Sequence, residues 1–66
     1  MPQFADVILP LPLSKYYTYR IPEELQPGMH PGCRVIVPFG RKKYYTAIVV
    51  YIHPYAPADY ETKDIL

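Results

Sequence analysis

Hydrophobic and polar residues alternate with a period of two in two segments of this chain, 16–21 and 34–39. The apolar positions are Tyr17, Tyr19 and Ile21 in the first segment and Val35, Val37 and Phe39 in the second. Alternation of this kind is typical of a β-strand that buries one face. The pattern therefore predicts strands over Tyr16–Ile21 and Arg34–Phe39.

Further strands are predicted from longer apolar stretches. Phe4–Leu9 is predicted to be the first strand. It should end at the prolines that follow, because proline has no backbone N–H to donate to a neighbouring strand. Tyr44–His53 is the longest, and residues 47–50 at its centre are apolar on both faces, so we expect a central, strongly curved strand. Tyr60–Leu66 is expected to start a last strand that the chain cuts short.

Turn-forming residues separate these segments. Pro27-Gly28 and Pro31-Gly32 predict a loop over 23–32, with one helical turn near 23–26. Gly40–Lys43 is predicted to be a short basic hairpin loop, and residues 54–59 a second loop.

The composition agrees with an all-β fold. Eight tyrosines and nine prolines in 66 residues favour strands and oppose helices. A chain of this length makes one domain, 1–66, and so few strands must roll up to hide their edges. We expect a small, partly open β-barrel of about five to six short strands, with at most one short helical turn.

Charge and cysteine content limit the function classes. The net charge is only +1, with most basic residues before residue 54 and an acidic segment after it, unlike the strong field of a duplex-DNA binder. The apolar runs are too short to span a bilayer, which predicts a cytoplasmic protein with no membrane partner. Cys33 is alone, so no internal disulfide or multi-cysteine zinc site can form, and we expect it to be a small buried residue.

The residues predict binding rather than catalysis. The chain has no glycine-rich phosphate loop and no nucleophile with a partnered base, and His30 and His53 lie in different contexts. Aromatic and basic residues are interleaved instead, at 16–20 and 41–45. Tyrosine rings stack on unpaired bases and neighbouring cations follow phosphates, so this pattern suits single-stranded nucleic acid. The alternative is that the tyrosines only cover the core and rim of a small barrel.

A series of motifs resembles a known family. In chain order they are Leu9-Pro10-Leu11-Pro12-Leu13, Tyr17-Thr18-Tyr19, the string Pro31-Gly32-Cys33-Arg34-Val35-Ile36-Val37-Pro38-Phe39-Gly40, Ala47-Ile48-Val49-Val50 and Lys63. Over about 7–66 they resemble the start of primosomal protein N-prime, the PriA-type replication-restart helicase. The proline-glycine to phenylalanine-glycine string is the most specific part, since shorter pieces occur in many SH3-like barrels.

The resemblance implies a bacterial, cytoplasmic domain that captures the 3′ end of a DNA strand at a stalled or branched fork. Its shallow pocket would accept any terminal base. The positions that match the family's pocket are Tyr17, Thr18, Gly40 and Lys63, with supporting DNA contacts expected from Tyr16, Arg41, Lys42 and Lys43. Thr18 departs from the family, which commonly has Asp there, and offers a neutral hydroxyl in place of a charge.

The remaining machinery of that family lies outside these residues. The resemblance implies that ATP, Mg and structural zinc belong to the rest of an ATP-dependent 3′-to-5′ helicase, and that this chain is no enzyme and needs no cofactor. It also implies single-strand-binding protein and other primosome proteins as partners of the parent. Two alternatives stay open: an SH3-like barrel that grips a proline-rich or partner segment, and a purely structural barrel that docks on a larger body.

Overall fold

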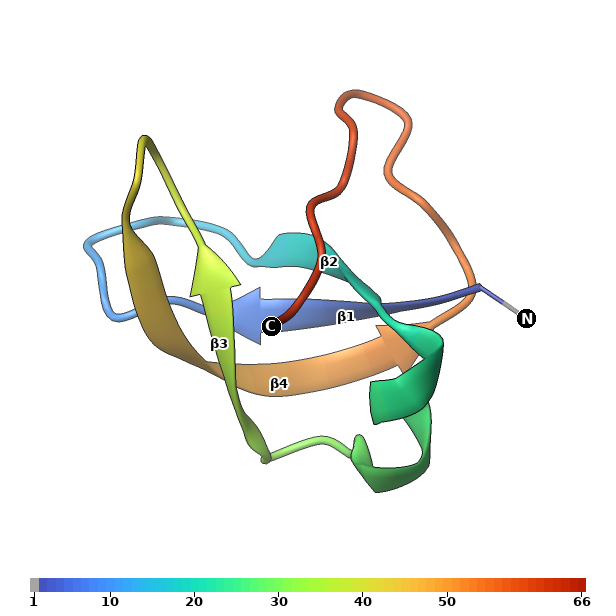
Figure 1. Ribbon diagram of the computed structural model, residues 1–66. Coiled ribbons are helices and arrows are strands. Elements are labelled where there is room, and N and C mark those ends of the chain that lie inside the picture. Colours follow the sequence, from blue (N-terminus) through green and yellow to red (C-terminus); the bar gives the residue numbers. More distant parts are fainter. Residues whose placement is uncertain (1) are drawn as a thin grey trace.

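The computed structural model describes residues 2–66 and contains four strands and one short helix (Figure 1). The strands are β1 (Gln3–Ile8), β2 (Tyr17–Ile21), β3 (Arg34–Pro38) and β4 (Tyr44–His53), and a 3₁₀ helix, η1, covers Glu23–Gly28. Within 2–66, no helix is long and apolar enough to cross a bilayer.

The strands form one antiparallel sheet in the order β2-β1-β4-β3, so β4 is internal, as its apolar centre predicts. The register of β1 against β4 shifts between Asp6, which pairs with Tyr51, and Val7, which pairs with Val49. A bulge of this kind bends the strand and increases its twist. The long β4 therefore curves, and the sheet curls into a half-barrel (Figure 1).

The inner face of the curled sheet carries the core. Its fully buried side chains include Val7, Ile21, Val37 and Val49, each at alternate positions of its strand. The period-two patterns of 16–21 and 34–39 thus point to the correct faces: Tyr19, Ile21, Val35 and Val37 are buried. Burial of each aliphatic side chain stabilises the fold by about 1.5 to 3 kcal/mol.

The C-terminal tail, residues 60–66, closes the gap between the two sheet edges (Figure 1). The Arg20 N–H donates to the Lys63 carbonyl (2.9 Å), and the Ile65 N–H donates to the Arg20 carbonyl (3.0 Å). The next N–H, that of Leu66, donates across to the Ile36 carbonyl of β3 (2.9 Å). Ile65 is only 2% exposed, so its side chain belongs to the core and anchors the tail.

The all-β, half-barrel class is confirmed, with two corrections in the described residues. Tyr60–Leu66 is not a strand: it makes only a bridge between Asp64 and Arg20, because its backbone divides its hydrogen bonds between β2 and β3. The sheet accordingly has four strands instead of five to six. Cys33 is half-buried rather than buried, and its Sγ lies 3.4 Å from the Met29 Sδ.

Candidate nucleic-acid interface

A pocket of about 190 Å³ lies between β2, the β3–β4 hairpin and the tail. We call it the aromatic pocket; its lining residues are Tyr17, Thr18, Tyr19, Pro38, Phe39, Gly40, Tyr60, Glu61 and Lys63. The four positions singled out in the sequence, Tyr17, Thr18, Gly40 and Lys63, all lie in it. The volume is below the about 300 to 1,000 Å³ of drug-sized ligand sites, so it suits a group as small as one base or sugar.

Two aromatic rings make one wall of the pocket. Tyr17 and Phe39 meet edge to face, with ring centroids 5.1 Å apart. The Lys15 Nζ lies 5.2 Å from the centroid of the Tyr17 ring, a cation–π contact that places a positive charge beside the same wall. Tyr17 is only half-buried, which leaves part of this aromatic wall open to solvent.

Tyr19 forms the floor and links two sides of the pocket. Its hydroxyl donates to the Pro38 carbonyl at 2.7 Å, and its side chain is buried. Burial, together with the nearby phenol groups of Tyr60 and Tyr17, raises the pKa of Tyr19 to about 12. The hydroxyl therefore stays protonated and keeps donating to β3 throughout the neutral range.

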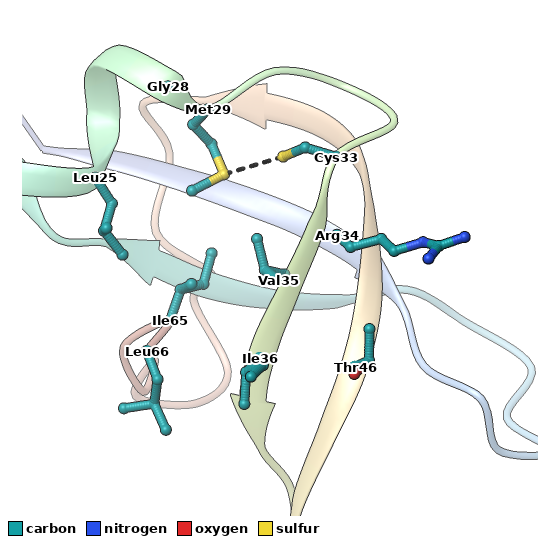
Figure 2. Close-up of a pocket in the computed structure, with 10 residues that line it drawn as sticks. All are labelled: Leu25, Gly28, Met29, Cys33, Arg34, Val35, Ile36, Thr46, Ile65 and Leu66. Carbon is teal, nitrogen blue, oxygen red and sulfur yellow. Dashed lines mark hydrogen bonds between the residues drawn. The ribbon is translucent and has the colours of Figure 1, made fainter.

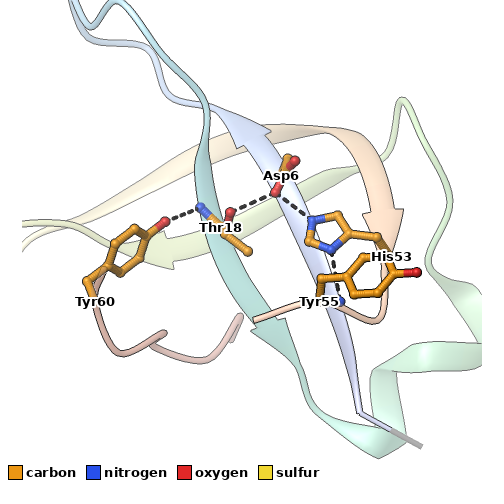
Figure 3. A network of polar contacts seen from close by, with 5 residues as sticks. All are labelled: Asp6, Thr18, His53, Tyr55 and Tyr60. Atoms are coloured by element: carbon orange, nitrogen blue, oxygen red, sulfur yellow. Dashed lines mark hydrogen bonds and ion pairs between the residues drawn. The ribbon is translucent and has the colours of Figure 1, made fainter. Parts of the chain in front are cut away.

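Thr18 connects the pocket to a polar network on the outer side of β2 (Figure 3). Its backbone N–H, at the free edge of β2, donates to the Tyr60 hydroxyl (2.9 Å). Its side-chain hydroxyl donates to the Asp6 Oδ1 (2.7 Å), on the neighbouring strand. With its hydrogen held by Asp6, the Thr18 hydroxyl has only lone pairs to offer a ligand.

Gly40 adopts a conformation that favours glycine. Its φ is +75°, in the left-handed region, where a side chain is strained. A Cβ built at this position would have no atom within 4 Å, so the space in front of its backbone is open. The geometry therefore serves the hairpin turn and also leaves room for a ligand to approach the main chain.

The tail brings one acid and one base to the pocket. Glu61 and Lys63 both line it and both are exposed. The only side-chain ion pair that the tail makes in the described part of the chain joins Asp64 to Arg20 (3.2 Å). The Glu61 and Lys63 charges are therefore not neutralised by protein partners within 2–66.

The residues expected to support DNA contacts lie outside the pocket lining. Arg41, Lys42 and Lys43 directly follow the lining residue Gly40 and are exposed on the hairpin. Lys42 has a φ of 54°, so the hairpin tip is tightly turned. Tyr16 points elsewhere: it is half exposed and meets Tyr51 edge to face, with centroids 6.0 Å apart.

Three lining residues that the sequence did not single out come from the hairpin and tail: Phe39, Tyr60 and Glu61. The sequence predicts Phe39 on a strand face and as part of the family string, without a role in the pocket, and it predicts the acidic tail as a truncated strand. The spacing of Glu61 and Lys63 is the one local signal, since residues two apart in extended backbone share a face. The contact of Tyr60 with Thr18 depends on how the tail crosses the curled sheet.

The outer network joins a hydroxyl, a carboxylate and an imidazole, yet differs from an activated nucleophile (Figure 3). The Asp6 carboxylate stands in the middle, 2.7 Å from the Thr18 hydroxyl and 2.8 Å from the His53 Nε2. In the hydroxyl–imidazole–carboxylate arrangement of hydrolases, the imidazole lies between the other two groups and takes the hydroxyl proton, whereas here the imidazole does not contact the hydroxyl. His53, stacked between Phe4 and Tyr55, instead holds the end of β4 against β1.

A second hollow, which we call the apolar groove, lies on the other side of Ile65 and has a volume of about 540 Å³ (Figure 2). It is lined by Leu25, Gly28, Met29, Cys33, Arg34, Val35, Ile36, Thr46, Ile65 and Leu66. Aliphatic and sulfur-containing side chains dominate this surface, and no aromatic ring is among them. The groove therefore offers apolar contact but no stacking platform.

Fold and pocket together define a small all-β binding domain with an aromatic, charged pocket at the closure of a half-barrel. The sequence model of one protein family, the 3′DNA-binding domain (3′BD) of PriA, matches residues 6–66, which is nearly the whole chain. The chain belongs to that family. This confirms the resemblance found in the sequence. Among curated proteins, no significant match is found.

Proposed function

We propose that this chain binds the 3′ end of a DNA strand in the aromatic pocket, without preference for the terminal base. The observation that carries the proposal is convergence: Tyr17, Thr18, Gly40 and Lys63, from three separate segments, line one pocket. These are the positions that the family resemblance implicates. Membership of the 3′ DNA-binding family supports DNA as the ligand.

The pocket's chemistry fits a terminal nucleotide. Tyr17 stacks on the base and reads its face rather than its edge, which gives tolerance of base identity. The open backbone at Gly40 admits the sugar, and Lys63 neutralises the adjoining phosphate. The cations of the 41–43 hairpin follow the strand as it leaves the pocket.

We propose further that the domain acts at stalled or branched replication forks, as the N-terminal module of a primosomal ATP-dependent DNA helicase in replication restart. Single-strand-binding protein and other primosome proteins are the partners of that larger protein. The PriA family of this domain supports the proposal.

Fluorescence anisotropy with short, 5′-labelled single strands tests end capture. The strands carry a 3′-hydroxyl, a 3′-phosphate or a blocked 3′ end, and each of the four bases in turn as the terminal base. We expect the 3′-hydroxyl strand to bind best and the terminal bases to bind alike. Equal binding to all three ends, or binding to none, contradicts the proposal. Binding to a proline-rich peptide with indifference to DNA would favour the interaction-barrel alternative.

A further inference from the structure

The aromatic pocket contains a single carboxylate among its lining residues, that of Glu61. Its position is unexpected for a site that faces a polyanion, because a free carboxylate repels phosphate. Within residues 2–66, no hydrogen bond or ion pair engages the Glu61 side chain; in the tail, the side chains with such partners are those of Tyr60 and Asp64. Glu61 is therefore a charged acceptor available to a ligand.

The hydrogen of the Thr18 hydroxyl is already donated, so this side chain offers a ligand only the lone pairs of a neutral group. Its hydroxyl donates to Asp6 on the outer side of β2, and Asp6 does not line the pocket (Figure 3). Three phenols also line the pocket: Tyr19 donates to the Pro38 carbonyl, Tyr60 accepts from the Thr18 N–H, and Tyr17 offers a ligand a neutral hydroxyl. Among these groups, the Glu61 carboxylate is the strongest acceptor for a hydroxyl donor.

Glu61 and Lys63 present opposite charges to the same pocket from alternate positions of the tail. The backbone fixes this segment, because the Lys63 carbonyl accepts from Arg20 and Ile65 is buried. A 3′-terminal nucleotide has a matching polarity: a neutral hydroxyl that donates at its 3′ side and an anionic phosphodiester at its 5′ side.

We propose that Glu61 determines the selectivity of the pocket for a 3′-hydroxyl over a 3′-phosphate, an inference that rests on the proposed 3′-end binding. The hydroxyl donates to the Glu61 carboxylate, while Lys63 neutralises the phosphodiester. A 3′-phosphate carries a charge of about −1.5 to −2 and no comparable donor, so it meets repulsion at Glu61 instead of a hydrogen bond. Because Glu61 is exposed, salt screens this repulsion.

The test compares Glu61→Gln with Asp59→Asn across three 3′ ends: hydroxyl, hydrogen (3′-deoxy) and phosphate. Asp59 is an exposed acid two residues earlier that does not line the pocket. Each variant replaces one carboxylate by a neutral amide, so both change the net charge equally. In the wild-type domain at low salt we expect the hydroxyl end to bind about tenfold better than the phosphate end, with the deoxy end between. Glu61→Gln should reduce this ratio to about twofold, and Asp59→Asn should leave it unchanged.

Two results overturn the role of Glu61. One is an unchanged hydroxyl-to-phosphate ratio in Glu61→Gln. The other is an equal gain of affinity for all three ends, which would make Glu61 a general repulsive charge. Both leave end binding intact, because the wild-type domain still prefers the hydroxyl end. Absence of any preference in the wild-type domain would instead contradict the proposed function itself. Thermal unfolding of each variant verifies that it remains folded.

Discussion

The aromatic pocket and the apolar groove lie on either side of the same tail, yet they differ in nearly every property that matters for binding. The groove is the larger, about 540 Å³ against about 190 Å³. Ile65 and Leu66 contribute aliphatic side chains to the groove, whereas Tyr60, Glu61 and Lys63 contribute a phenol and two charges to the pocket. By volume alone, the groove would be the better candidate for the binding site. The recognisable chemistry of a nucleotide, with its flat base, donor hydroxyl and phosphate, matches the pocket.

The difference arises from how the tail is seated. Ile65 is the buried anchor. Residues before it line the aromatic pocket, and Leu66 after it lines the apolar groove. The anchor therefore supports both surfaces at once. Substitutions at the anchor, at the aromatic rings and at the charged residues therefore separate their contributions, and those at the anchor should have the largest effect.

Ile65→Ala removes the anchor and should lower the free energy of unfolding by about 2 to 5 kcal/mol, as for other buried aliphatic truncations. In a domain of this size such a loss unfolds much of the population. Urea titration followed by circular dichroism measures it. Ile48→Ala, at a position that is 45% exposed, is the control and should cost about 0.5 kcal/mol or less. A loss as small as the control's would show that the tail is not anchored by Ile65.

High pH should weaken the fold through Tyr19. The folded domain keeps the Tyr19 proton up to about pH 12, whereas the unfolded chain releases it near its ordinary value of 10.0. The folded state binds more protons between these values, so the free energy of unfolding falls as the pH rises through that window. Urea titrations at stepped pH should show the decline, and Tyr19→Phe should diminish it. An identical decline in Tyr19→Phe would assign it to other groups.

Tyr17→Ala should weaken binding to a DNA 3′ end by about 1 to 2 kcal/mol, because one stacking face is lost. Anisotropy with a 3′-hydroxyl strand measures the change. Tyr55→Ala, at a position that is 73% exposed and outside the pocket, is the matched control and should bind like the unaltered domain. Unfolding of Tyr17→Ala would make Tyr17 a core residue and contradict its role as a stacking wall.

Replacement of Lys42 and Lys43 by alanine should reduce affinity modestly and make binding less dependent on salt. Each lost phosphate contact lowers the slope of log affinity against log salt by about 0.7 for a single strand. Arg34→Ala, which removes a cation beside the apolar groove, is the control and should leave the slope unchanged. An unaltered slope in the lysine variant would mean that the hairpin faces away from DNA.

Much of the fold follows from local pattern. The bounds predicted for β4 are those observed, and the alternation in 16–21 and 34–39 places Tyr19 and Val37 in the core. The prediction of a strand over 60–66 was wrong because the backbone pairing of this segment depends on the bulge that curls the sheet. The curled sheet leaves a gap between its edges, and Ile65 fills it. Period-two alternation carries no information on such a gap.

The pocket could be predicted only in part. The positions of Tyr17, Thr18, Gly40 and Lys63 came from the family resemblance, and their roles in binding stay predictions. Glu61 was not foreseen because its relation to the pocket depends on the path of the tail. Likewise, the link from Thr18 to Asp6 follows from the register of β1 against β2, which no local motif encodes.

The central claim is that the aromatic pocket, and not the larger apolar groove, receives the 3′ end of DNA. Amide chemical-shift mapping by NMR during titration with a short 3′-hydroxyl strand tests it most directly. We predict the largest shifts at Tyr17, Gly40 and Lys63, with Met29, Cys33 and Ile36 unmoved. Shifts concentrated at Met29, Cys33 and Ile36, with the pocket residues unmoved, would contradict the claim.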